Sequence, residues 1–210
     1  MATRRLSVEH LKTCVEKAAE MGAHLLGGPL YAPIGYLPPH RPQPDEWAWA
    51  IEALQALIPL LDQHSITLGI EPVNCSETFF LRTAHEARAL CQEIGHASIG
   101  VTLDTFHANI EEKNIATAID QLGPSLKHIH LSENDRSLLG SGHIDFPAIL
   151  AALLRNQNTG MLMIEGFGFS PTETNAPGTL WAETSVSPEE IATRGLAYIR
   201  QLRPAASNPC

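Results

Sequence analysis

Residues 99–104 read Ile-Gly-Val-Thr-Leu-Asp, a mostly apolar run of strand length that ends in a carboxylate. The run lacks a strict alternation of apolar and polar residues, which is typical of a strand covered on both faces. Three other stretches share this pattern, with an acidic or imidazole residue at or near the end: Leu68-Gly-Ile-Glu71, His128-Ile-His-Leu131 and Met161-Leu-Met-Ile-Glu165. Together they indicate a buried parallel sheet whose strands end in functional groups.

Helical stretches separate these strands, and several begin at recognisable caps. Thr83-Ala-His-Glu86 and Ser187-Pro-Glu-Glu190 are capping boxes, and Asp145 can cap a further helix. Apolar residues at helical spacing predict other helices from about Ser7 to Gly22, from about Asp45 to His64, and over Ile115 to Leu122. Alternating helices and strands favour an α/β domain with a parallel sheet.

With a further apolar run at residues 24–30, the sequence predicts five strands, the others lying at about 67–73, 99–104, 128–132 and 161–166. A closed (β/α) barrel has eight strands and usually about 250 residues. We therefore expect an incomplete barrel over residues 1–203, followed by a disordered tail at residues 204–210. Its first and last strands would be apolar edges, which pair readily with other chains, so a homo-oligomer is expected.

Charge and composition exclude several classes of partner. The formal net charge is -9, and no cluster of Lys and Arg occurs, so neither a nucleic acid nor an anionic membrane surface is expected to bind. No apolar run approaches the length of a membrane span. The four cysteines are scattered, which indicates neither a disulfide framework nor a zinc cluster, and a cytoplasmic location is the expectation.

The strand ends predict a metal site. In a parallel barrel the carboxyl ends of all strands open on one face, so Glu71, Asp104, His130 and Glu165 are expected to meet there. Three buried carboxylates repel one another unless a cation or a partner compensates their charge. Carboxylate and imidazole ligands suit a divalent ion, and we expect Mn²⁺, with Mg²⁺ and Co²⁺ as alternatives.

Each of these residues, taken alone, also has an ordinary structural explanation. A carboxylate at a strand end is often a helix cap or an ion-pair partner, and a single histidine is often a core residue. His128 and His130 share a strand face, and His128 is expected to be the structural one. Glu77, His107 and Arg136 follow the strands and can hydrogen-bond a ligand, although Arg136 would fit a surface salt bridge equally well.

Five motifs carry a resemblance to a known family. They are Gly27-Gly-Pro-Leu-Tyr-Ala-Pro33, Ile70-Glu-Pro-Val-Asn74, Leu103-Asp-Thr-Phe-His-Ala-Asn109, His128-Ile-His-Leu-Ser-Glu-Asn-Asp-Arg136 and Ile164-Glu-Gly-Phe167. With these motifs the chain resembles the sugar phosphate isomerase/epimerase family, which has xylose-isomerase-like TIM barrels, and within it the D-tagatose 3-epimerase and D-psicose (allulose) 3-epimerase group. The resemblance covers nearly the whole chain and is more specific for the superfamily than for the substrate.

The resemblance implies an isomerase, namely a metal-dependent ketose 3-epimerase acting on a free or phosphorylated sugar. The family's metal ligands fall on Glu71, Asp104, His130 and Glu165. Its contacts to substrate hydroxyls fall on Glu77, His107 and Arg136. Glu71 and Glu165 would then remove and return a proton through a cis-enediolate. Candidates for the aromatic wall of the sugar pocket are Tyr31, Phe106 and Phe167.

The resemblance also implies which strands are missing. The chain begins just before the helix that precedes the family's fourth strand, so the N-terminal three units of the barrel are expected to be absent.

Three alternatives to the epimerase stay open. The same cluster would serve an aldose–ketose isomerase of the hydroxypyruvate or xylose isomerase type, or the chain could be a truncated, inactive metal-binding protein. A zinc endonuclease of the same superfamily would need more histidine ligands and a basic face, which this acidic chain lacks.

Overall fold

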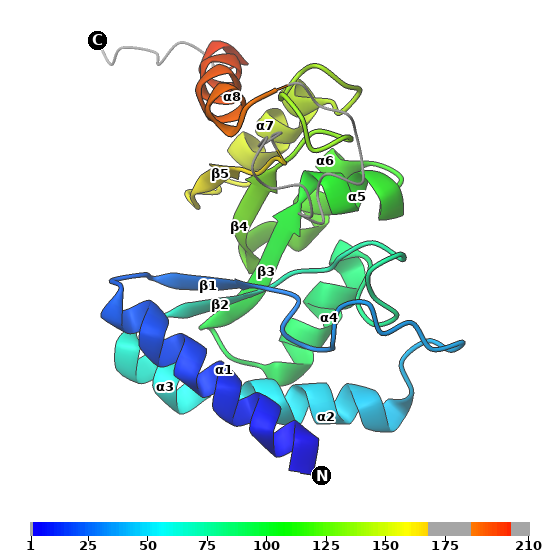
Figure 1. The fold of residues 1–210 in the computed structure, drawn as a ribbon, viewed down its shortest axis with the longest axis vertical. Helices are drawn as coiled ribbons and strands as arrows, with labels where there is room; N and C mark the ends of the chain where they lie inside the picture. Colours follow the sequence, from blue (N-terminus) through cyan, green and yellow to red (C-terminus); the bar gives the residue numbers. More distant parts are fainter. Residues whose placement is uncertain (1, 168–185, 203–210) are drawn as a thin grey trace.

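The computed structural model describes residues 2–167 and 186–202, and these form five parallel strands in the order β1-β2-β3-β4-β5 (Figure 1). The strands are β1 (Leu25–Gly28), β2 (Thr67–Ile70), β3 (Ile99–Asp104), β4 (Leu126–Leu131) and β5 (Leu162–Ile164). Within the described ranges each strand pairs only with its neighbours in sequence, and the sheet curves as part of a barrel. The prediction of an incomplete TIM-type barrel with five strands is confirmed.

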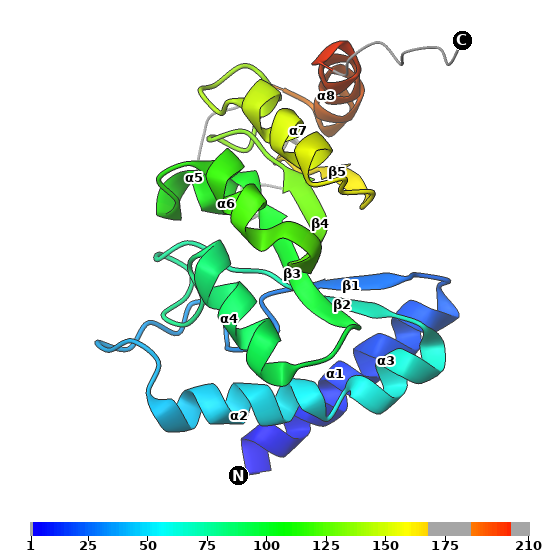
Figure 2. The ribbon, with the colours of Figure 1, turned by 180° about the vertical axis from the view of Figure 1, so that it is seen from behind.

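Helices follow the strands as in other (β/α) structures. They are α1 (Ala2–Glu20), α2 (Pro44–Gln55), α3 (Ile58–His64), α4 (Ala84–Ile94), α5 (Thr105–Glu111), α6 (Ile115–Leu122), α7 (Phe146–Arg155) and α8 (Pro188–Leu202), with a 3-10 turn η1 (Gly123–Ser125). Helices α4, α6 and α7 cover the face of the sheet that is turned to the viewer in Figure 2. Of the helices in the described ranges, none has the length and apolar character needed to cross a membrane.

The predicted helix caps are confirmed. Thr83 accepts a hydrogen bond from the backbone N–H of Glu86, and the Glu86 carboxylate accepts one from the N–H of Thr83. Asp145 caps α7 through the N–H of Ala148, and Ser187 caps α8 through the N–H of Glu190. The expected tail at residues 204–210 lies outside the described residues.

Two predicted helix boundaries are wrong. Helix α1 begins at Ala2, and Ser7 lies inside it, where its hydroxyl donates to the carbonyl of Thr3 one turn earlier. Serine can bond a carbonyl four residues back, so a serine before apolar residues is not a certain cap. The helix expected from Asp45 to His64 is two helices. Pro59 lacks an N–H and its ring clashes with the preceding turn, so the first helix ends before it.

One helix was not predicted at all. Helix α5 starts directly after β3, and Asp104 caps it by accepting a hydrogen bond from the N–H of Phe106 at 2.9 Å. Residues 105–111 read Thr-Phe-His-Ala-Asn-Ile-Glu, in which β-branched and aromatic residues give little helix propensity. Asp104, the last residue of β3, therefore makes two kinds of contact: Oδ1 caps helix α5, and Oδ2 faces the candidate site.

The alternation of side chains along the strands separates the core from the inner face of the curve. Leu68, Ile70, Val101 and Leu103 are fully or almost fully buried in the core. The residues between and after them in β2 and β3 point to the opposite side, because successive side chains of a strand alternate. That inner face carries Gly69, Glu71, Gly100, Thr102 and Asp104, a combination of small and polar residues that suits a site rather than a second core.

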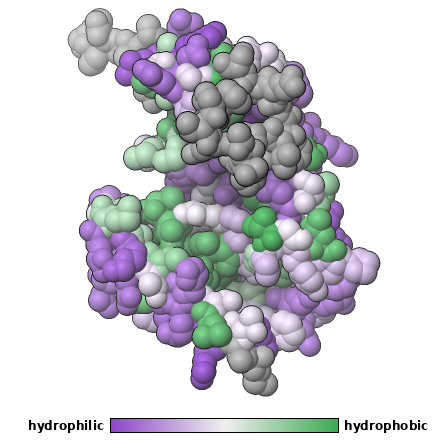
Figure 3. All heavy atoms as spheres, viewed as in Figure 1, coloured by the Kyte–Doolittle hydropathy of each residue, from purple (hydrophilic) through white to green (hydrophobic). Residues whose placement is uncertain are grey.

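Beside these small and polar residues, the inner face, which is turned away from α4, α6 and α7, also carries exposed apolar residues. Hydrophobic side chains gather in its hollow (Figure 3). At the β5 edge, Met161 and Met163 are 69% and 46% exposed. Self-association through such an edge stays a prediction.

Close packing on the inner face generates a stability prediction. A Cβ added at Gly69 would fall well inside the contact distance of Thr102 Oγ1. We expect Gly69→Ala to lower the free energy of unfolding by about 1–3 kcal/mol, as measured by urea denaturation. Thr102→Ala removes that hydroxyl, which has no hydrogen-bond partner among the described residues, and should restore most of the loss in the double variant. An equal loss in both backgrounds would contradict the proposed contact.

Candidate metal and substrate site

Four side chains from four strands meet at one point of the inner face. Ligand atoms of Glu71, Asp104, His130 and Glu165 all lie within 4.8 Å of one another. Asp104 and His130 are register partners in β3 and β4. Glu71 and Glu165 directly follow β2 and β5, and their backbone N–H groups continue the ladders by donating to Gly28 and Leu131. The curved sheet therefore fixes the backbone of all four residues.

Three carboxylates in this cluster lie beside one guanidinium, that of Arg136. Asp104 is fully buried and Glu71 nearly so, and burial disfavours the charged form of a carboxyl group. Burial raises the pKa of Asp104 to about 7 despite the adjacent Arg136, and the Glu165 and Glu71 carboxylates act in the same direction. Burial also acts to raise the pKa of Glu165, but His130 and Arg136 outweigh it and lower the value to about 2.

His130 lies between two carboxylates of the cluster. Its Nδ1 lies 3.1 Å from Glu165 Oε2 and 3.6 Å from Glu71 Oε1, yet it makes no hydrogen bond within the described residues. Burial acts to lower the pKa of His130, but the two carboxylates outweigh it and raise the value to about 10. The two carboxylates thus favour a positive charge at or beside this nitrogen. A divalent cation would supply that charge, and three carboxylates with one imidazole suit a hard or borderline ion.

Arg136 belongs to the cluster and does not form the surface salt bridge that the sequence allowed. It is 4% exposed, and its Nη1 lies 2.5 Å from Asp104 Oδ2 and 2.9 Å from Glu165 Oε2. Its guanidinium stacks near the rings of Phe106 and Phe167, at 4.3 Å and 5.1 Å from their centroids. Its backbone has a φ of 59°, in the left-handed region that a residue with a long side chain rarely adopts.

The loop after β4 holds Arg136 in this conformation. The N–H of Arg136 donates to the carbonyl of Glu133, and its side chain also donates to Ser132 Oγ at 2.7 Å. Glu133 is fully buried, and its carboxylate accepts hydrogen bonds from the N–H groups of Gly140 and Ile144. Nothing in the local sequence singles out Glu133 or Ser132, because both gain their partners only when this loop folds back on itself.

His107 and Glu77 lie beside the cluster and are linked by Asn74. His107 is 5% exposed, and its Nε2 lies 3.2 Å from Arg136 Nη2 and 3.9 Å from Asp104 Oδ2. Burial and the Arg136 charge lower the pKa of His107 to about 3, so the ring is neutral. Asn74 contacts His107 Nδ1 and donates to Glu77 Oε1 at 2.8 Å. All seven predicted site residues are thus joined by short contacts, while their individual roles stay proposals.

The remaining candidates from the sequence lie around this centre. His128 is buried, and its ring centroid lies 4.9 Å from that of His130. Phe106 and Phe167 flank Arg136, as described above. The hydroxyl of Tyr31 donates to the carbonyl of Leu81 at 3.1 Å, which ties this side chain to the loop after β2.

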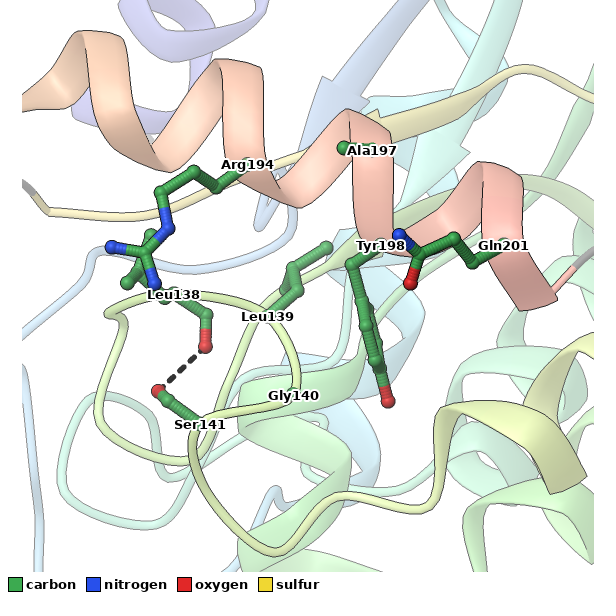
Figure 4. A pocket seen from close by; sticks show the side chains of 8 residues that line it. All are labelled: Leu138, Leu139, Gly140, Ser141, Arg194, Ala197, Tyr198 and Gln201. Atoms are coloured by element: carbon green, nitrogen blue, oxygen red, sulfur yellow. Dashed lines mark hydrogen bonds between the residues drawn. The ribbon is translucent and has the colours of Figure 1, made fainter.

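A separate cavity of about 440 Å³ lies between α8 and the loop of residues 138–141 (Figure 4). It is lined by Leu138, Leu139, Gly140, Ser141, Arg194, Ala197, Tyr198 and Gln201. None of the seven predicted site residues lines it. The cluster at the strand ends is therefore the better candidate for chemistry.

The chain was compared with known protein families and with known proteins. The family described as xylose isomerase-like TIM barrel matches residues 2–202. The D-psicose 3-epimerase of Agrobacterium fabrum is 30% identical over 206 residues, covering 95% of this chain and 71% of the relative. The D-psicose 3-epimerase of Enterocloster bolteae is 34% identical, covering 78% of this chain and 54% of the relative.

A solved structure shares the fold. The D-allulose 3-epimerase from Methylomonas sp., in complex with D-allulose, superposes with a TM-score of 0.84 at 27% identity, covering 94% of this chain and 69% of that one. This chain therefore spans between 54% and 71% of the length of these three proteins.

The cluster generates a binding prediction. Titration of the chain with Mn²⁺, followed by calorimetry, should show one site that EDTA empties. Asp104→Asn and His130→Ala each remove a charged or basic ligand and should weaken binding at least about tenfold. Asp120→Asn is the matched control, because Asp120 pairs with Arg155 at the surface and is 41% exposed. Equal affinity in all four proteins would place the ion elsewhere.

Proposed function

Because this chain belongs to the xylose isomerase-like TIM barrel family, we propose that it is a metal-dependent ketose 3-epimerase whose ion is Mn²⁺. The observation that carries the proposal is the cluster itself. Two glutamates from non-adjacent strands, Glu71 after β2 and Glu165 after β5, approach the same His130 nitrogen. The relatives from Agrobacterium fabrum and Enterocloster bolteae are both D-psicose 3-epimerases, and psicose is a ketose, which supports the same class of reaction here.

The four clustered residues would hold the ion. Glu71, Asp104 and Glu165 offer carboxylate oxygens, and His130 offers Nδ1, the buried nitrogen without a hydrogen bond. When bound there, a divalent cation supplies a Lewis acid that polarises the ketose carbonyl and acidifies the neighbouring C–H.

The two glutamates would carry the proton. Strands β3 and β4 separate β2 from β5, so Glu71 and Glu165 reach the site from opposite parts of the curved sheet. A ketose bound between them presents one face of C3 to each carboxylate. One glutamate removes the C3 proton to leave a cis-enediolate, and the other delivers a proton to the opposite face, which inverts the configuration at C3.

The neighbouring residues would hold the sugar oxygens. Arg136 and His107 offer N–H donors beside Asp104, and Glu77 offers an acceptor at the outer side of His107. Donors fixed in a buried site stabilise the negative oxygen of the enediolate more strongly than water does. The rings of Phe106 and Phe167 contact the guanidinium of Arg136 and would help to keep it in place.

The decisive assay follows the hydrogen at C3. The chain is incubated in D₂O with Mn²⁺ and a panel of free and phosphorylated ketoses, and products are identified by NMR. We expect one ketose to give its C3 epimer with deuterium at C3, and EDTA to stop the reaction. Formation of an aldose would favour the aldose–ketose isomerase instead. No turnover of any ketose would contradict the proposal for this chain.

Variants of the two glutamates test the assigned roles. Glu165→Gln keeps an oxygen that can coordinate a metal but cannot accept a proton, so the rate should fall by about 100-fold or more while Mn²⁺ still binds. Glu71→Gln should behave in the same way. Glu189→Gln, an exposed change in the first turn of α8, is the matched control and should be as active as the unaltered chain. Near-normal turnover by Glu165→Gln would remove that residue from the proton-transfer pair.

A further inference from the structure

Asn74 is held in one orientation by its neighbours. It is 1% exposed and lies three residues after Glu71. Its Oδ1 accepts a hydrogen bond from the backbone N–H of Ser76 at 2.9 Å, and its Nδ2 donates to Glu77 Oε1 at 2.8 Å. A backbone N–H can only donate and a carboxylate can only accept. The oxygen and the nitrogen of the amide therefore cannot be exchanged, and the NH₂ group must face His107.

The two N–H donors of Asn74, one in the backbone and one in the amide, decide which nitrogen of His107 carries the proton. His107 Nδ1 lies 2.9 Å from Asn74 Nδ2 and 3.2 Å from the backbone nitrogen of Asn74. Both groups are donors, so Nδ1 must present its lone pair. A neutral imidazole has one N–H, which must then be on Nε2.

The Nε2–H of His107 then points toward a second donor. Arg136 Nη2 lies 3.2 Å from Nε2, and the guanidinium has only N–H groups. The closest carboxylate oxygen to Nε2 among its ion-pair partners, Asp104 Oδ2, is 3.9 Å away. Two adjacent N–H donors can both be hydrogen-bonded when one acceptor atom lies within reach of both. A carbonyl or hydroxyl oxygen of a sugar is such an acceptor.

We infer that Asn74 is a positioning residue: its backbone N–H and its side-chain amide together hold His107 in the Nε2–H tautomer, so that His107 and Arg136 together donate to one oxygen of the ketose. The inference rests on the proposed ketose substrate for the identity of that oxygen. The tautomer itself follows from the hydrogen bonds alone. Asn74 thereby connects two proposed substrate residues, Glu77 and His107.

Two substitutions separate this role from a purely structural one. Asn74→Asp keeps the shape and the acceptor for the Ser76 N–H, but it places a carboxylate oxygen against His107 Nδ1 and so favours a proton there. Asn74→Ala loses the turn contact, but the backbone N–H at position 74 still donates to Nδ1. A positioning role makes Asn74→Asp the more damaging change. A role limited to the loop makes Asn74→Ala the more damaging one.

The tautomer is measured first, on the chain labelled with ¹⁵N-histidine and loaded with diamagnetic Mg²⁺. Long-range ¹H–¹⁵N correlation spectra distinguish a protonated from an unprotonated ring nitrogen, and His107→Gln identifies the His107 signals. We expect the proton on Nε2 in the unaltered chain and in Asn74→Ala, and on Nδ1 in Asn74→Asp. A proton on Nδ1 in the unaltered chain would overturn the inference, whether or not the chain is an epimerase.

Kinetics then test the consequence for the sugar. Asn74→Asp should lower kcat/KM for the ketose about tenfold or more, the scale of one lost hydrogen bond to a charged or developing charge, with Mn²⁺ affinity unchanged. In a His107→Gln background, whose amide can donate without any tautomer, the further loss caused by Asn74→Asp should shrink to about twofold. The full loss in that background, or a greater loss for Asn74→Ala than for Asn74→Asp, would contradict the positioning role.

Discussion

The mutual repulsion of three carboxylates at one point of the sheet is the constraint around which this structure is arranged. Glu71, Asp104 and Glu165 converge with His130 within 4.8 Å, and water can screen the buried carboxylates of Glu71 and Asp104 little. Such a cluster is costly unless positive charge is supplied. Arg136 supplies one positive charge. Against the effect of burial, the carboxylates also raise the pKa of His130 to about 10, which shows that they favour further positive charge at this point. A divalent cation is the simplest remaining source.

The fold provides both the convergence and the room for it. Four successive parallel strands deliver one residue each, and the backbone ladders continue through Glu71 and Glu165 at the ends of β2 and β5. Gly69 and Thr102 precede Glu71 and Asp104 by two residues on the same inner face. Their small side chains leave space next to the cluster. The loop after β4 then brings Arg136 back over the site, held by the buried carboxylate of Glu133.

The sequence was sufficient for those features that depend on local pattern. The strand ends at Glu71, Asp104 and Glu165 follow from apolar runs that stop at a carboxylate, and the capping box at Thr83 follows from a four-residue signature. Helix α5 could not be predicted in the same way, because its residues have little helix propensity and it depends on Asp104 as a cap. The break near Pro59 was predictable in principle, since an interior proline ends a helix, but the regular apolar spacing outweighed it in our interpretation.

Contacts between distant residues were beyond the reach of local pattern. Asn74 and His107 are separated by 33 residues, and only the curve of the sheet brings the amide to the imidazole. Arg136 looked equally suited to the surface, because nothing in its neighbourhood signals a left-handed backbone or a pocket between two phenylalanines. The residues expected to do chemistry were thus visible in the sequence, whereas those that orient them emerged only from the three-dimensional arrangement.

The central claim is that Glu71, Asp104, His130 and Glu165 bind a single divalent ion. It is tested most directly by a crystal structure of the chain grown with Mn²⁺, using anomalous scattering to locate the metal. We predict one strong anomalous peak inside the cluster, with a ligand atom of each of the four residues at about 2.0–2.3 Å from it. A peak at another place, or an ion in the cluster that leaves two of the four residues unligated, would contradict the claim.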